Sequence, residues 1–205
     1  MENKLVLFIK DYNLTAGEQV LFQNFSLDVF EGEIIGFFAP TGTGKTSLFN
    51  YIANIADVGP KPVEGLSVSY VFQEPRLIPS LPVLKNVMLP LEKKMDDNAA
   101  KNLAIEWLEK LHMSHKMNDL AKTLSGGEQQ RTALARAFAY TCASALLLLD
   151  EPFASQDETN TKNIVELIKQ LVEKTKCACL VISHDRQVLE GLCSRIITQK
   201  DFIVS

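Results

Sequence analysis

The sequence lacks the features that mark several large classes of protein. Its 21 Lys and Arg are outnumbered by 25 Asp and Glu, which gives a net charge of −4. A nucleic-acid ligand is therefore not expected, because binding to a phosphate backbone depends on many basic contacts. No apolar run approaches the roughly 18 residues of a membrane-spanning helix. The apolar stretch within Met1–Lys10 is too short for the core of a signal peptide, so we expect a cytoplasmic chain.

Cysteine and tryptophan are scarce, and neither indicates a ligand site. The cysteines form no CxxC pair and have no histidine at metal-ligand spacing. Thiols stay reduced in the cytosol, so we expect small buried side chains rather than disulfides. These cysteines are Cys142, Cys177, Cys179 and Cys193. Trp107, the only tryptophan, recurs with Leu103, Leu108 and Leu111 at helical spacing, which favours a place in the core.

The chain has 205 residues, of which 46% are hydrophobic and 22% charged, as in an ordinary globular domain.

Two prolines exclude a helix at Val58–Pro62. Residues 78–123 are expected to be mostly helical. The other predicted strands and helices alternate. Strands are predicted at Leu5–Ile9, in pieces within Glu18–Phe30, and at Ile34–Phe38, Ser67–Phe72, Leu146–Leu149 and Ala178–Ser183; helices are predicted at Thr46–Ile55, Asn98–Met113 and Thr161–Lys174.

This alternation predicts an α/β fold with a mainly parallel sheet flanked by helices. The helical block between the strands is interpreted as an inserted α-helical subdomain. We expect one domain over residues 1–205, with a nucleotide-binding core formed by residues 1–73 and 140–205. The helical subdomain is expected at about 74–139.

A phosphate-binding loop follows the predicted strand Ile34–Phe38. Its glycines allow backbone N–H groups to surround a phosphate, and the helix that begins there adds its positive dipole end. Lys45 would reach the β- and γ-phosphates, and the Thr46 hydroxyl would bind Mg²⁺. Ala39 stands where the pattern has its first glycine; it is costly if that position needs a positive φ and harmless otherwise. The loop comprises Ala39, Pro40, Thr41, Gly42, Thr43, Gly44, Lys45 and Thr46, and Ser47 follows it.

Further segments, in the same order, resemble the motifs of ABC transporter ATP-binding subunits. Leu124–Arg131, with the sequence LSGGEQQR, is similar to the ABC signature motif, and Leu146–Pro152, with the sequence LLLLDEP, to a Walker B strand. Gln73 matches the Q-loop, His184 the switch histidine and Asp157 the D-loop aspartate. The resemblance covers essentially the whole chain and implies a P-loop NTPase fold with an antiparallel β subdomain. The stretch from Lys45 to Gln73 is short for the family, so that β subdomain is expected to be reduced.

The resemblance also implies a role for each motif. Asp150 and Gln73 would join Thr46 in holding Mg²⁺, and Glu151 would act as base for the attacking water. Gln73 would also touch that water, and His184 would orient it and contact the γ-phosphate. Ser125, Gly126 and Gly127 would bind the γ-phosphate of ATP held by an opposing subunit in a head-to-tail dimer, and the D-loop position of Asp157 places it among the nucleotide-binding residues as well.

Beside the nucleotide base the sequence departs from the family pattern. Alignment places Thr15 or Ala16 where the family has an aromatic ring that stacks on adenine. Either the base is held weakly, or another ring such as Tyr12 replaces the missing one. Packing in the core is the interpretation we favour for Tyr12.

The expected function is ATP hydrolysis that drives solute transport through a partner permease, on the cytoplasmic face of the cell or inner membrane. The second ATPase subunit could be an identical or a related chain. Phe72–Pro79 resembles nitrate, sulfonate and taurine importers, so import with a solute-binding protein is favoured. The LSGGEQQR sequence also occurs in lipoprotein-release and macrolide-export systems, which leaves export as an alternative. A non-transport ABC ATPase is disfavoured, because those proteins carry long coiled-coil or zinc insertions.

Overall fold

The structure, a computed structural model, describes residues 4–55, 66–141 and 145–203. Cys142 and the predicted connection Val58–Pro62 lie outside the described residues. Two sheets are present in the described chain, one parallel with five strands and one antiparallel with two. The elements follow one another as β1 (Leu5–Ala16), β2 (Gln19–Phe30), β3 (Ile34–Phe38), α1 (Lys45–Ile52), β4 (Val68–Val71), α2 (Val83–Met88), α3 (Asp97–Lys110), α4 (Gly126–Thr141), β5 (Leu146–Asp150), α5 (Glu158–Thr175), β6 (Ala178–Ile182), α6 (Arg186–Leu192) and β7 (Arg195–Thr198), with short 3-10 turns at Ser114–Lys116, Ala121–Thr123 and Gln199–Asp201.

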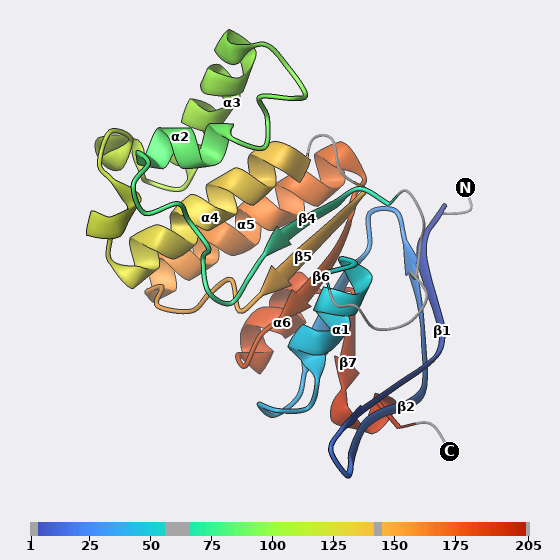
Figure 1. Cartoon of the computed structure of the whole chain (residues 1–205). Helices are drawn as coiled ribbons and strands as arrows, with labels where there is room; N and C mark the ends of the chain where they lie inside the picture. The colour runs from blue at the N-terminus through green and yellow to red at the C-terminus, as the bar shows by residue number, and fades with distance from the viewer. Residues whose placement is uncertain (1–3, 56–65, 142–144, 204–205) are drawn as a thin grey trace.

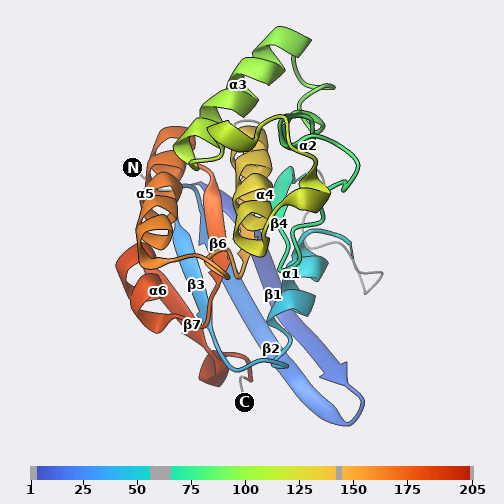
Figure 2. The same cartoon turned by 90° about the vertical axis from the view of Figure 1, so that its left-hand side faces the viewer.

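The parallel sheet has the strand order β4-β5-β6-β3-β7, and every neighbouring pair in it is parallel. Helices α4, α5 and α6 cover one face, while α1 and the β1–β2 hairpin lie on the other (Figure 1). Figure 2 shows the same layers from the side. These findings confirm the α/β fold with a parallel sheet between layers and a reduced antiparallel part.

Alternate residues of the buried strands supply two separate cores. Leu147 and Leu149 pack with α4 and α5 on one face, whereas Leu146 and Leu148 pack with α1 and the hairpin on the other. Because helices or strands cover both faces, apolar residues are favoured on both sides of β5, and its one polar residue, Asp150, stands at the carboxyl end. This double covering explains why β5 shows no alternation of polar and apolar residues and begins with four consecutive leucines.

Several predicted boundaries are wrong in an instructive way. Glu18–Phe30 was expected to hold several short strands, but β2 is one continuous strand. It pairs with β1, which extends beyond the predicted Leu5–Ile9 as far as Ala16. Polar residues such as Asn24 lie on the exposed side of the hairpin or at its register shifts, so they do not end the strand. Residues 78–123 are less helical than expected, because irregular segments and short 3-10 turns separate α2 from α3 and α3 from α4. Helix α6 and strand β7 were not predicted.

The expected core residues are largely confirmed. Trp107 is buried and meets Phe138 edge to face at 5.3 Å, with Lys110 Nζ 4.6 Å above its ring. Leu103 is only half-buried at the margin of this cluster. Cys177 and Cys179 are buried and Cys193 is half-buried, and no disulfide joins cysteines of the described chain. No helix in the described parts of the chain is long and apolar enough to cross a membrane.

Candidate nucleotide-binding and hydrolysis site

Four neighbouring parallel strands end at one edge of the sheet, and each leads into a predicted site residue. The phosphate-binding loop follows β3, Gln73 follows β4, Asp150 ends β5, and His184 follows β6. Ligands of open α/β sheets bind at the carboxyl ends of the strands, where the direction of the connections changes. The topology therefore gathers residues that are more than 100 positions apart in the chain.

A cavity of about 210 Å³ opens at this edge. Most of the predicted catalytic and loop residues line it, together with two apolar residues, Leu21 and Ile182, that the sequence did not indicate. The lining consists of Leu21, Thr41, Gly42, Gly44, Lys45, Thr46, Ser47, Gln73, Asp150, Glu151, Ile182 and His184. The volume suits the phosphate part of a nucleotide, and the lining supplies the polar groups that such a ligand requires.

The loop before α1 is shaped by two glycines and one lysine. Gly42 and Gly44 have φ values of 81° and 88°, in the left-handed region that glycine occupies without strain. A Cβ atom on Gly44 would also lie 2.9 Å from the ring of Phe22 in β2. Because Gly44 is the N-cap of α1, the first turn of this helix has no side-chain cap, and its N–H groups suit an anion.

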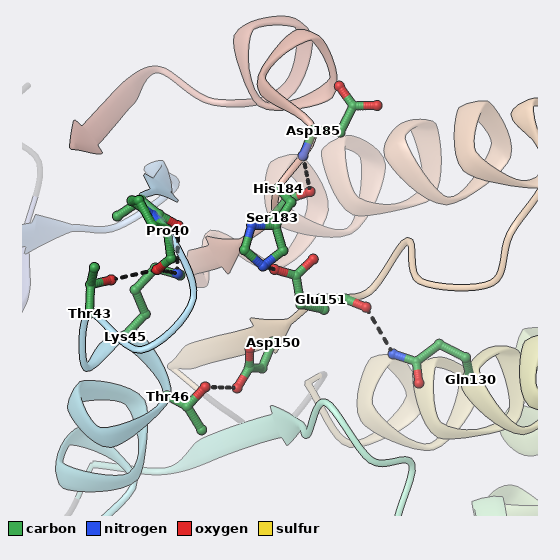
Figure 3. A network of polar contacts seen from close by, with 11 residues as sticks. Pro40, Thr43, Lys45, Thr46, Gln130, Asp150, Glu151, Ser183, His184 and Asp185 are labelled. Atoms are coloured by element: carbon green, nitrogen blue, oxygen red, sulfur yellow. Dashed lines mark hydrogen bonds and ion pairs between the residues drawn. The ribbon is translucent and has the colours of Figure 1, made fainter. Parts of the chain in front are cut away.

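Lys45 lies at the centre of this loop. Its Nζ donates to the carbonyl oxygens of Ala39 at 2.7 Å and Pro40 at 2.8 Å, and Thr43 Oγ1 donates to Pro40 as well (Figure 3). Burial lowers the pKa of Lys45, against the opposing effect of the Glu151 and Asp150 charges. Ala39 is buried without a positive φ, so its methyl group adds no backbone strain. Ala39, Pro40 and Thr43 thus shape the loop without lining the cavity.

A hydroxyl and a carboxylate meet on the opposite side of the cavity. Thr46 Oγ1 donates to Asp150 Oδ2 at 2.8 Å, and Gln73 lines the same cavity. Asp150 is 1% exposed, and burial raises the pKa of its carboxyl group. The donor set consists of hard oxygen atoms, which suits Mg²⁺ held by one or two side chains together with phosphate oxygens. No cluster of three acidic, histidine or cysteine residues able to cage a metal occurs in the described parts of the chain.

Glu151 and His184 face each other beside the loop. The Nε2 atom of His184 lies 3.2 Å from Oε1 of Glu151 (Figure 3). Glu151 has a φ of 52°, a strained conformation that its N–H stabilises by donating to the Ile182 carbonyl at 3.0 Å. Burial raises the pKa of the Glu151 carboxyl group, and the nearby His184 opposes that rise. A carboxylate with these properties suits general-base work.

The residues before and after His184 are held by hydrogen bonds. Ser183 Oγ accepts a hydrogen bond from the Asp185 N–H at 3.1 Å, and the Asp185 side chain caps α6 by accepting from Val188 N–H. The imidazole is 54% exposed, so it can rotate between Glu151 and a bound phosphate. Neither Ser183 nor Asp185 was predicted as part of the site, because each acts only through its neighbour.

The signature motif lies apart from the cavity. Ser125 and Glu128 form a capping box at the start of α4, in which the Ser125 N–H and Oγ both donate to Glu128 Oε2, at 2.8 and 2.9 Å. Ser125 and Gly126 are exposed, and neither they nor Gly127 line the cavity. Asp157 likewise faces elsewhere: it caps α5 by accepting from the Asn160 N–H at 2.7 Å. Contact of these residues with a nucleotide stays a prediction that needs a second subunit.

Among the residues that the structure describes, no aromatic side chain lines the cavity. Tyr12 is buried against Tyr51 and Phe22, with ring centroids 4.6 and 5.5 Å apart, and burial raises its pKa to about 12. The preference for a packing role is therefore confirmed. Thr15 and Ala16 are exposed at the end of β1.

Comparison with known proteins agrees with this site. Residues 22–154 match the ABC transporter family. The chain belongs to that family. It is 37% identical over 183 residues to the aliphatic sulfonates import ATP-binding protein SsuB 1 of Nocardia farcinica, covering 88% of this chain and 72% of the relative. It is 31% identical to the methionine import ATP-binding protein MetN of Clostridium tetani, covering 92% of this chain and 64% of the relative.

Solved structures extend the agreement to the whole fold. A dimeric bacterial ABC transporter cassette superposes with a TM-score of 0.82 at 29% identity, covering 100% of this chain and 97% of the other. The chain is therefore an ATP-binding subunit of an ABC transporter, and its reaction is the hydrolysis of ATP. The resemblance drawn from the motifs is confirmed, while the roles of individual residues stay proposals.

Proposed function

We propose that this ATP-binding subunit works as a head-to-tail dimer that drives solute import through a partner permease. One observation supports the dimer most strongly: Ser125, Gly126 and Gly127 do not line the cavity that holds Lys45 and Glu151. Ser125 and Gly126 are exposed and Gly127 is half-buried at the beginning of a 16-residue helix, whose positive dipole end and first N–H groups suit a phosphate. In a head-to-tail pair, that phosphate is the γ-phosphate of ATP bound by the opposite subunit.

Hydrolysis then follows from the geometry of one cavity. Lys45 exchanges its bonds to the Ala39 and Pro40 carbonyls for bonds to the β- and γ-phosphates. Thr46, Asp150 and Gln73 would hold Mg²⁺, which neutralises the phosphate charge when it is bound. Glu151 accepts a proton from the attacking water, and its raised pKa strengthens it as a base.

His184 would orient Glu151 and the γ-phosphate around the attacking water. Its Nε2 lies within reach of Glu151, and its exposed ring can turn to hydrogen-bond the γ-phosphate. Bulk water would be excluded when the signature motif and Asp157 of the second subunit cover the cavity. Energy from these contacts is available only when both subunits close, which couples hydrolysis to a movement of the permease.

Import of a small organic solute is the direction that the relatives support. Two relatives are named as importers, of aliphatic sulfonates and of methionine. The chain would sit at the cytoplasmic face of the membrane through its permease, with a solute-binding protein that delivers the substrate.

The test is to look for a neighbouring gene that encodes a polytopic membrane protein and to reconstitute the chain with that protein. We expect the proteins to co-purify, and the complex in proteoliposomes to hydrolyse ATP faster when a loaded solute-binding protein is present. Alkanesulfonates and methionine are the first solutes to compare, and a complex with Glu151→Gln is the inactive control. Failure to bind any such permease, or stimulation by solute on the side of the ATPase, would overturn the import proposal.

A further inference from the structure

One side chain fastens the turn after β5 to the beginning of α4. The amide oxygen of Gln156 accepts a hydrogen bond from Arg131 Nη1 at 2.9 Å, and its amide nitrogen donates to the Gly127 carbonyl at 3.1 Å. Both partners belong to the signature motif, and they lie 25 and 29 residues from Gln156 in sequence. The amide thus uses its acceptor and its donor to join two distant segments, which lie side by side in Figure 2.

The backbone around Gln156 is equally close to α4. A Cβ atom on Gly127 would lie 2.7 Å from the carbonyl oxygen of Ser155, so only glycine permits this approach. Ser155 has a φ of 59°, and the Gln156 N–H donates to the Phe153 carbonyl at 3.2 Å. The 153–157 turn is therefore tight and locally strained, and such a conformation persists only when neighbouring contacts hold it.

Helix α4 also contacts Glu151, the first residue of the segment that joins β5 to α5. Gln130 Nε2 donates to the Glu151 carbonyl at 3.4 Å, and the Ala154 N–H donates to the same carbonyl at 3.1 Å. Figure 3 shows Gln130 directed from α4 toward Glu151. Helix α4 is thus bonded both to the backbone of the candidate base and to the turn that follows it.

We propose that Gln156 is a positioning residue that makes the signature motif and Glu151 move as one unit. The proposal rests on the head-to-tail dimer proposed above, because there the two ends of the unit serve different nucleotides. Ser125–Gly127 contact the ATP of the opposite subunit, whereas Glu151 acts on the ATP of its own. A γ-phosphate bound at the signature motif therefore draws Glu151 into position beside the ATP of its own subunit. The two sites then hydrolyse ATP cooperatively.

The prediction is a change in turnover without a matching change in ATP binding. Gln156→Leu keeps the volume of the side chain and removes both hydrogen bonds to α4. We expect kcat to fall about fivefold to tenfold, with KM for ATP within about twofold of wild type, because the loop that binds the phosphates is untouched. The Hill coefficient for ATP should fall toward one.

Two further variants separate positioning from packing. Gln156→Glu keeps the acceptor for Arg131 and loses the donor for Gly127, so it should give an intermediate kcat. Gln170→Leu is the matched control, because Gln170 lies exposed on α5 and donates only to Glu166 at 2.9 Å. The measurement is steady-state ATP hydrolysis by the purified full chain, with thermal unfolding of each variant recorded alongside.

The outcomes distinguish this inference from the dimer itself. The dimer is tested first, by the ATP-dependent association of Glu151→Gln with and without Gln156→Leu. If the parent Glu151→Gln stays monomeric with ATP, the proposed dimer fails and the coupling fails with it. If the parent dimerises but Gln156→Leu matches Gln170→Leu in kcat and Hill coefficient, the coupling alone is overturned. A lower unfolding temperature with unchanged kcat also overturns it, since that is the result of packing. Should Gln156→Leu fail to fold, Gln156→Glu decides in the same way.

Discussion

His184 Nε2 lies 3.2 Å from Glu151 Oε1, which links the loop after β6 to the residue that follows β5. The pair forms across two strands that are hydrogen-bonded in register, with Asp150 opposite Ile182. The parallel pairing of β5 and β6 therefore places Glu151 and His184 together at the cavity before any nucleotide binds. Preorganisation of this kind lowers the cost of aligning groups during the reaction.

Replacement of Glu151 by glutamine should separate ATP binding from hydrolysis. Glu151→Gln keeps the shape of the side chain but cannot accept the proton of the attacking water. We expect turnover to fall by at least about 100-fold while Mg-ATP affinity stays near wild type. Phosphate release and equilibrium binding measure the two quantities, with Glu166→Gln on the exposed face of α5 as control. Near-normal turnover of Glu151→Gln would remove this carboxylate from the mechanism.

Thr46 should control the dependence of the reaction on Mg²⁺. Its hydroxyl donates to Asp150 at 2.8 Å, and Thr46→Val replaces that oxygen with a methyl group of similar size. We expect the Mg²⁺ concentration for half-maximal hydrolysis to rise about tenfold or more, because one oxygen ligand is lost. Thr159→Val, on an exposed turn of α5, is the matched control. An unchanged Mg²⁺ requirement in Thr46→Val would show that Thr46 is not a ligand.

The nucleotide base should be recognised weakly. Leu21 and Ile182 are the apolar residues that line the cavity, and Tyr12, the ring considered as a substitute for the missing one, is buried against Tyr51. Phosphate and Mg²⁺ contacts are the same for both purine nucleotides, so GTP should compete with ATP to within about tenfold. Competition binding measures this ratio in wild type and in Tyr12→Phe, which keeps the packed ring. A strong ATP preference in wild type would show that another group, from this chain or a partner, reads the base.

The parts of the site that the sequence predicted are those whose chemistry dictates both residue type and spacing. A loop that surrounds phosphate needs glycines at fixed positions, and Gly42 and Gly44 do have positive φ values. Asp150 followed a run of leucines, and a buried strand that ends in a carboxylate is recognisable without any structure. For the same reason the order of strands and helices in the core was largely predictable.

The parts that the sequence did not reveal depend on contacts between distant segments. Nothing in the local sequence marks Gln156, because its role arises from meeting Gly127 and Arg131 across the fold. Leu21 and Ile182 line the cavity only because the beginning of β2 and the end of β6 lie there. Strand β7 pairs with β3 over only four residues. A pattern of alternating polar and apolar residues that short cannot be distinguished from a loop in the sequence.

The central claim is that ATP is held between the phosphate-binding loop of one subunit and the signature motif of another. Its most direct test is the oligomeric state of Glu151→Gln, measured by size-exclusion chromatography with light scattering. Ser125→Arg in the same background should block closure, because a large cation replaces the small residue that would face the phosphate in the proposed dimer. Ser114→Arg, an equal change at an exposed serine away from the motif, is the control.

We predict that Glu151→Gln is monomeric without nucleotide and dimeric with Mg-ATP, that Ser125→Arg abolishes this dimer, and that Ser114→Arg leaves it intact. A Glu151→Gln chain that stays monomeric with Mg-ATP, or a dimer that forms without ATP and survives Ser125→Arg, would contradict the account.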